Sequence, residues 1–207
     1  VGIITVDDIV DVIEQETTED MDKMAAVLPS DDEDLKMSVL ELAKNRIPWV
    51  CVLMISGTLS AFVVEQYQTL LSSVVILSSF MTIITGTGGN AGSQASAMII
   101  RGMALGEIQL RDTMKVVSKE FCVGLICGAI LGLVNMARMT FLSRGTDVVV
   151  DLTVSISMAA AVILAKTIGC LLPILAKAVR LDPAMRAGPL ISTVVDAIAL
   201  VMYFSIA

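Results

Sequence analysis

Long uninterrupted runs of apolar residues make up most of the chain after residue 46. A helix needs about 20 such residues to cross the hydrocarbon core of a bilayer. The runs predict five membrane-spanning helices, at residues 47–64, 67–100, 121–142, 148–176 and 185–207. The second run is too long for one straight crossing, and we expect the glycines between Gly86 and Gly92 to interrupt its helix. This pattern is typical of an all-α membrane protein.

The first 46 residues are polar and acidic, and none of their apolar stretches is long enough to span a membrane. Residues 1–5 predict a short strand. Residues 6–28 alternate between an apolar face and an acidic face at helical spacing, which predicts an amphipathic helix that ends at Pro29. A second polar helix is predicted over residues 30–46, with Ser30 as its N-cap. We expect both helices to lie in water.

Composition supports the membrane assignment and restricts the metals that the chain can bind. Hydrophobic residues make up 56% of the chain and charged residues only 17%, whereas soluble domains average about 25% charged. The chain has no histidine, and its four cysteines are scattered without a Cys-x-x-Cys pair. Zinc and copper sites therefore lack suitable ligands. Oxygen ligands are plentiful, and they suit Mg²⁺, Ca²⁺ or Mn²⁺.

Basic residues are distributed very unequally between the two sides of the predicted spans. With the N-terminal tail inside, eleven of the fourteen Lys and Arg residues fall on the inner side and two on the outer side, while Lys166 lies within the fourth span. This predicts a multi-pass protein of the cell membrane with a cytoplasmic N-terminus and an outside C-terminus. Thirteen acids against four bases make residues 1–46 anionic, which favours cations or a basic partner and argues against nucleic acid.

Asp196 is the one formal charge between Ala187 and the end of the chain, and it falls near the middle of the last span. A carboxylate there costs about 2.5–3.5 kcal/mol unless it faces a partner, an ion or water. Ser192 lies one turn earlier, and Gly188 and Pro189 can free backbone carbonyls at the start of the helix. These oxygen atoms predict a passage for a cation. The alternative is a structural carboxylate that hydrogen-bonds to a neighbouring helix.

The string GTGGNAGSQ, residues 86–94, predicts a close approach of backbones at membrane depth, a broken helix, or both. Helix packing alone explains the glycines, whereas Asn90 and Gln94 are better explained as hydrogen-bonding supports of a pore. The string lacks the Gly-Lys-Ser/Thr ending of a phosphate-binding loop. We therefore expect no nucleotide site and no enzymatic activity.

Two further features of the later spans have structural interpretations. Gly124, Gly128 and Gly132 repeat at intervals of four, which predicts a packing face between helices or between subunits. Lys166 either extends its ammonium toward the membrane surface or pairs with Asp151 or Asp196. Because a fixed cation beside a cation path would be repulsive, we expect Lys166 to lie away from that path.

Three strings in combination resemble the MgtE family of magnesium channels: GTGGNAGSQ at 86–94, RGMALGEIQLRD at 101–112 and LDPAMRAGPLISTVVDAIAL at 181–200. The resemblance covers essentially the whole chain. It implies a homodimer of five-helix protomers with a pore at the subunit interface. It also implies three parts, which are the end of a CBS domain with an acidic connecting "plug" helix (1–29), a cytoplasmic amphipathic helix (30–46) and the pore domain (47–207).

The resemblance also implies roles for particular residues. Asp196 matches the pore acid that holds a hydrated ion in the family. Ser192 matches the position whose backbone oxygen contacts the ion's waters. Gly188 lies where the family's extended segment before the last helix begins. Asn90 lies in the glycine-rich motif beside the pore. Five acids match positions associated with magnesium-dependent gating, namely Asp8, Asp11, Glu16, Glu19 and Asp20.

The implied function is passive, potential-driven uptake of Mg²⁺, with cytosolic Mg²⁺ also acting as the regulatory ion. The residues by themselves leave two alternatives open, a cation-coupled divalent metal exchanger and a non-conducting membrane protein that senses Mg²⁺. Selectivity among Mg²⁺, Mn²⁺ and Co²⁺ also stays open, because oxygen ligands serve each of them.

Overall fold

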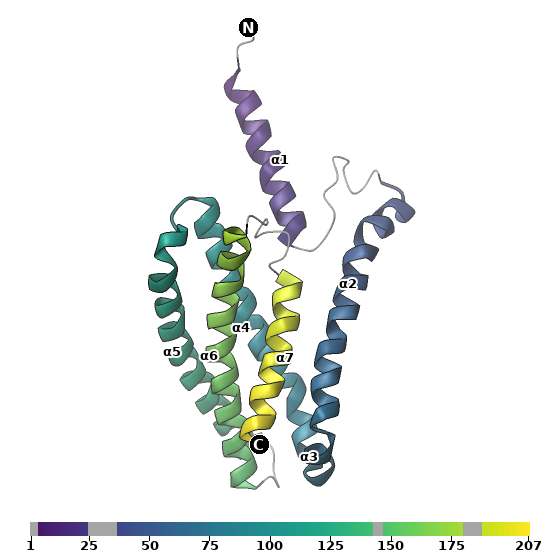
Figure 1. The fold of residues 1–207 in the computed structure, drawn as a ribbon, viewed down its shortest axis with the longest axis vertical. Coiled ribbons are helices and arrows are strands. Elements are labelled where there is room, and N and C mark those ends of the chain that lie inside the picture. The colour runs from purple at the N-terminus through teal and green to yellow at the C-terminus, as the bar shows by residue number, and fades with distance from the viewer. Residues whose placement is uncertain (1–3, 25–36, 143–146, 180–187) are drawn as a thin grey trace.

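Every regular element of the computed structural model is a helix within the residues that it describes, which are 4–24, 37–142, 147–179 and 188–207 (Figure 1). The helices are α1 (Val6–Met24), α2 (Val39–Gln66), α3 (Gln68–Ser73), η1 (Val75–Leu77), α4 (Ser78–Ala104), η2 (Leu110–Asp112), α5 (Thr113–Leu142), α6 (Val148–Ala178) and α7 (Gly188–Ile206), where η marks a short 3-10 helix. The prediction of an all-α chain is confirmed for these ranges.

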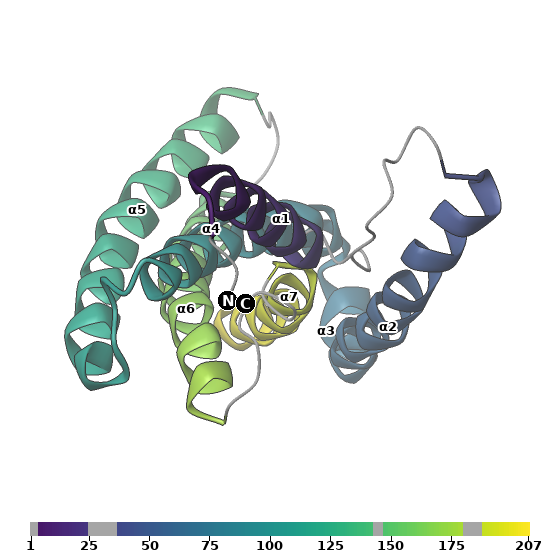
Figure 2. The same ribbon diagram turned by 90° about the horizontal axis from the view of Figure 1, so that it is seen from above.

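Helix α6 is the centre of a four-helix group. It packs against α4, α5 and α7, and α4 also packs along α7. Helix α2 stands at one side with α3 and reaches the group mainly through α7, as Figure 2 shows from above. Helix α1 extends beyond one end of the bundle, and the C-terminus lies at the other end (Figure 1). The last helix is therefore enclosed by neighbours from three other parts of the chain.

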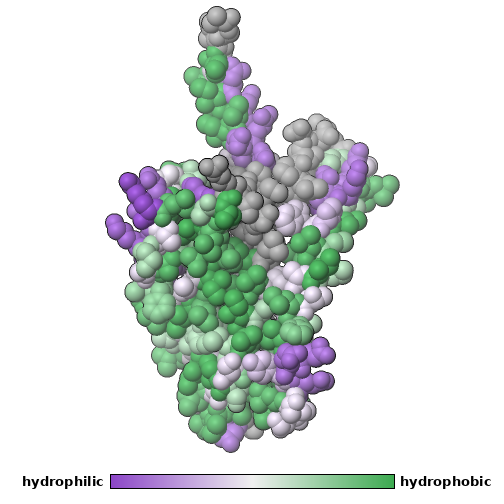
Figure 3. All heavy atoms as spheres, in the orientation of Figure 1, coloured by the Kyte–Doolittle hydropathy of each residue, from purple (hydrophilic) through white to green (hydrophobic). Residues whose placement is uncertain are grey.

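Within the described residues, three helices, α2, α5 and α6, are long and apolar enough to cross a membrane. Figure 3 shows a broad hydrophobic belt with hydrophilic residues gathered near its two ends. Helix α4 has 27 residues but carries a glycine-rich polar segment, and the apolar part of α7 covers only Ile191–Ile206. Membrane insertion is thus supported by α2, α5 and α6, and crossing by α4 and α7 stays a prediction.

The prediction that glycines interrupt the second span is wrong. Helix α4 runs without a break through Gly86 and Gly92, and the chain bends earlier, at Tyr67 and Val74. A broken helix would leave backbone N–H and C=O groups unpaired at membrane depth, where each costs several kcal/mol. The helix is continuous despite its glycines, which let its neighbours come close, so of the two expected consequences only the close approach occurs.

The N-terminal segments differ in detail from the prediction. Ile4 and Thr5 form no regular structure, and Pro29 and Ser30 lie outside the described residues. The second helix begins at Val39, is capped by Ser38 through a hydrogen bond from the Glu41 N–H, and continues past Arg46 to Gln66. Pro48 lies inside it. A proline removes one helical hydrogen bond, and here this does not end the helix, so the end of the polar segment and the first span form one element.

Aromatic residues near the end of α7 contact residues near the start of α4. The hydroxyl of Tyr203 donates to the carbonyl oxygen of Leu77 at 2.9 Å, and both residues are buried. The ring of Phe204 stacks on Tyr67 with centroids 4.9 Å apart. Buried Phe80 and Met158 belong to the same apolar cluster. This cluster holds α7 in register against α4 and α6, and so positions Asp196.

Candidate ion-binding site at Asp196

One face of α4 consists of glycines that let α6 and α7 approach its backbone. A methyl group added at Gly88 would lie 3.5 Å from Cβ of Ala199, and one at Gly92 would lie 3.0 Å from Cγ2 of Val195. On α6, a methyl group at Gly169 would overlap the carbonyl oxygen of Gly92. Helices α4 and α6 therefore meet backbone to backbone at Gly92 and Gly169, and α7 contacts the glycine face of α4 through its own side chains Val195 and Ala199.

Asp196 lies at this contact. A methyl group at Gly89 would lie only 2.9 Å from its Oδ1, so the carboxylate occupies the space that a larger residue at position 89 would fill. Oδ1 is buried and accepts no hydrogen bond from the residues that the structure describes, although the side chain as a whole is partly exposed. Buried polar groups in proteins almost always have a partner. An oxygen left unpartnered in this position is suited to an ion or to its water.

Ser192 lies one turn before Asp196, and its Cβ is 3.7 Å from the same point beside Gly89. Next to it, the hydroxyl of Ser56 on α2 lies 3.4 Å from Oγ1 of Thr193, within hydrogen-bonding distance. The structure therefore brings Ser192 and Asp196 together on one side of α7, with α4 and α2 as neighbours.

The other two predicted pore positions are placed differently. Asn90 is exposed, so it does not share the contact that its neighbour Gly89 makes with α7. Gly188 is the first helical residue of α7, with Pro189 second, rather than part of an extended segment. Proline is well tolerated in the first turn because its missing N–H has no helical partner there.

The acids predicted to sense Mg²⁺ lie on α1, which projects away from the bundle (Figure 1). Asp8, Asp11 and Glu16 are exposed and Glu19 is partly buried, while the side chain of Asp20 lies outside what the structure describes. Among the described residues, no three His, Cys, Asp or Glu side chains are grouped closely enough to hold a metal. These acids and Asp196 are therefore separate features of the chain.

Asp8 has a defined structural role at the start of α1. Its Oδ2 accepts hydrogen bonds from the N–H of Thr5 at 2.8 Å and from the Thr5 hydroxyl at 2.6 Å. The Thr5 hydroxyl accepts in return from the N–H of Asp8 at 3.3 Å, which completes a reciprocal cap. The hydrogen bonds from Thr5 lower the pKa of the Asp8 carboxyl below its ordinary value.

The prediction that Gly124, Gly128 and Gly132 form a packing face is confirmed for α5, and the same contact shows which helix lies beside Lys166. Methyl groups at Gly128 and Gly132 would lie 2.7 and 3.0 Å from the carbonyl oxygens of Ala159 and Ser155, so these glycines form a contact between α5 and α6. A methyl group at Gly124 would lie 3.7 Å from Cβ of Lys166. Lys166 therefore lies beside α5, and its expected position away from the cation path stays a prediction.

The sequence reasoning did not identify Gly89 as the residue that faces Asp196. The sequence did contain a sign of this contact. Gly88 and Gly89 are adjacent and Gly92 follows one turn later, so the three glycines together widen the face of α4 that carries no side chains. The pattern could not say which helix would pack on that face.

Comparison with known proteins identifies the family of the chain. Residues 81–206 match the profile of the MgtE family, described as a divalent cation transporter. The whole chain is 33% identical to the magnesium transporter MgtE of Thermus thermophilus and 34% identical, over 206 residues, to that of Enterococcus faecalis. It is 33% identical to the corresponding transporter of Bacillus subtilis, and it spans less than half the length of these relatives, 45%, 44% and 45% respectively. The chain therefore belongs to the MgtE family of divalent cation transporters.

Proposed function

We propose that the protein conducts Mg²⁺ passively across the cell membrane, with Asp196 as the residue that binds the passing ion. The observation that carries the proposal is the buried Oδ1 of Asp196, which has no hydrogen-bond partner among the described residues and faces the bare backbone at Gly89. The names of the curated relatives, all magnesium transporters, support Mg²⁺ as the ion.

The chemistry of Mg²⁺ fits a site with few carboxylates. The ion gives up its waters reluctantly and is commonly held by one or two carboxylates with several waters retained. In the proposed homodimer, two copies of Asp196 face the interface and balance the charge of one hydrated ion. Ser192 and nearby backbone carbonyls then accept hydrogen bonds from its waters. Weak holding through water also lets the ion leave, which conduction requires.

The proposal extends to orientation and control. The N-terminus faces the cytoplasm, so the inside-negative membrane potential drives cations inward by about 2.3 kcal/mol per charge for each 100 mV. Residues 1–29 are the end of a CBS domain with the connecting helix, and residues 30–46 are cytoplasmic. The acids of α1 take part in closing the pore when cytosolic Mg²⁺ is abundant, because divalent ions allow acidic surfaces to pack together.

Replacing Asp196 tests this function directly. Asp196→Ala is expected to abolish Mg²⁺ uptake into proteoliposomes, because the charge that attracts the ion is removed. Glu65→Ala, which removes an exposed acid at the far end of α2, is the matched control and should leave uptake unchanged. Near-normal uptake by the Asp196 variant would exclude the proposed site.

Reversal potentials test the passive mechanism separately. A channel follows the Mg²⁺ gradient alone, whereas an exchanger shifts its reversal potential with the Na⁺ or proton gradient. Binding of Mg²⁺ without any current would instead indicate a non-conducting sensor.

A further inference from the structure

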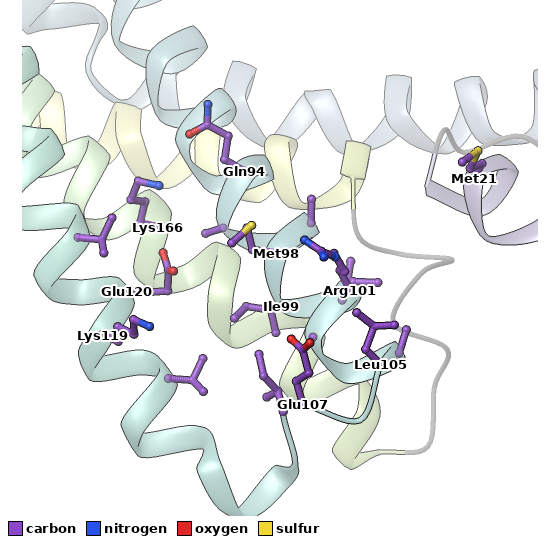
Figure 4. A pocket seen from close by; sticks show the side chains of 18 of the residues that line it. Met21, Gln94, Met98, Ile99, Arg101, Leu105, Glu107, Lys119, Glu120 and Lys166 are labelled. Carbon is purple, nitrogen blue, oxygen red and sulfur yellow. The ribbon is translucent and has the colours of Figure 1, made fainter. Parts of the chain in front are cut away.

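Helices α4 and α5 both pack on α6 but make almost no contact with each other. Between them lies a cleft of about 1400 Å³, shown in Figure 4. Its walls come from the second half of α4 and the first half of α5, and Lys166 of α6 lines it between them, while Thr17 and Met21 of α1 also contribute. Asp196, Ser192 and Gly89 are not among the residues that line the cleft, so the cleft is separate from the Asp196 site.

Among the residues that the structure describes, five charged ones line this cleft, and the cations outnumber the acids. Arg101, Lys119 and Lys166 are basic, and Glu107 and Glu120 are acidic. Lys166 is only 7% exposed and lies about three turns before the end of α6. The structure shows no hydrogen bond or ion pair between Lys166 and any residue that it describes, Glu120 included. An unpaired charge at membrane depth costs about 2.5–3.5 kcal/mol. We therefore expect an anion to bind the ammonium group of Lys166.

Apart from Thr17 and Gln94, the other described residues of the lining are apolar or glycine. Ala97, Met98, Val116 and Val123 line the walls one turn before or after the charged groups, and Met98 is 62% exposed. The volume exceeds the roughly 300–1,000 Å³ that is typical of pockets for drug-sized molecules. The cleft therefore suits a long molecule with an anionic head and an apolar body, which is the chemistry of a membrane phospholipid.

We propose that this cleft binds an anionic phospholipid, with its phosphate facing Arg101, Lys119 and Lys166 and an acyl chain along Met98 and Val123. The formal charges of the described lining residues leave one net positive charge, which matches a singly charged phosphodiester better than doubly charged inorganic phosphate. The bound lipid neutralises Lys166 and fills the gap between α4 and α5. This inference does not depend on ion conduction by Asp196.

Native mass spectrometry of the full chain in detergent tests the site, with phosphatidylglycerol, phosphatidylcholine and inorganic phosphate as the three probes. We expect retained phosphatidylglycerol and little phosphatidylcholine or phosphate. Arg101→Gln and Lys119→Gln should each weaken phosphatidylglycerol binding about fivefold, as expected for the loss of one basic residue near a membrane surface. Lys166→Met should weaken it at least as much, because this cation is the most buried of the three.

Lys44→Gln is the matched control, because Lys44 is an exposed cation near the start of α2 and does not line the cleft. Equal weakening by Lys44→Gln would overturn the proposal in favour of general surface attraction. Displacement of the lipid by inorganic phosphate would show a phosphate site instead. Unchanged lipid retention in Arg101→Gln and Lys119→Gln would also overturn the lipid proposal. If those variants also changed the oligomeric state, the cleft would be assigned to contact with a second copy of the chain.

Discussion

Gly89 and Asp196 form the closest contact of the candidate ion site, and one methyl group is enough to disturb it. In Gly89→Ala, the added carbon would lie 2.9 Å from Oδ1 of Asp196, so the carboxylate must move. Overpacking of this kind typically costs about 1–3 kcal/mol. We expect Mg²⁺ uptake into proteoliposomes to fall about tenfold while the chain stays folded.

Gly86→Ala is the control for this change. It adds the same methyl group to the same helix, but nothing lies within 4 Å of it. Uptake by Gly86→Ala should equal that of the unchanged chain, and its stability should rise slightly because alanine favours the helix more than glycine does. Equal uptake by Gly86→Ala and Gly89→Ala would show that the contact with Asp196 has no part in ion binding.

At the scale of elements, the crossing of α4 and α6 depends on glycine in both helices. A methyl group at Gly169 would overlap the carbonyl oxygen of Gly92, so Gly169→Ala forces the helices apart. Backbone cannot move aside as a flexible side chain can. We expect a loss of stability of about 1–3 kcal/mol, measured by thermal unfolding of the purified chain. Gly57→Ala on α2, where nothing lies within 4 Å, should cause no such loss and serves as the comparison.

The start of α1 has its own pH dependence through Asp8. Hydrogen bonds from Thr5 lower the pKa of its carboxyl from the ordinary value of 3.8, which means that they favour the ionised form. The stabilisation of the helix start is therefore complete above pH 3.8 and is lost as the pH falls through the lowered value. NMR should show the Thr5 amide shifting over that range.

Two variants check this assignment. Asp8→Asn should remove most of the change at the Thr5 amide, because the titrating group is gone. Asp11→Asn removes an exposed acid on the same helix and should leave the titration intact. A Thr5 amide that titrates equally in Asp8→Asn would contradict the reciprocal cap.

At the scale of the whole molecule, the hydrophobic belt and its hydrophilic ends (Figure 3) make orientation a measurable property. Thr69 and Arg111 are exposed at opposite ends of α4, before its start and after its end. With the four native cysteines replaced by alanine, Thr69→Cys should react with a membrane-impermeant maleimide on intact cells. Arg111→Cys should react only after the cells are permeabilised, because the basic residues favour its side as the cytoplasmic one. Labelling in the opposite order would reverse the proposed topology.

Hydropathy and helical period are properties of consecutive residues, so the sequence by itself determined the helical character of the described chain after residue 5 and the apolar runs that became α2, α5 and α6. It also isolated Asp196 as the single charge in the last helix and gave the spacing of Gly124, Gly128 and Gly132 that packs α5 on α6. Each of these follows from neighbours along the chain.

Only the tertiary structure decided that Gly89 faces Asp196, that α4 runs unbroken through its glycines, and that Lys166 turns toward a cleft beside α5. These depend on which helix packs on which, between residues far apart in the chain. A glycine in a sequence permits either a break or a close approach. The structure shows the close approach, because α6 and α7 pack on the glycine face of α4 while the helix stays unbroken.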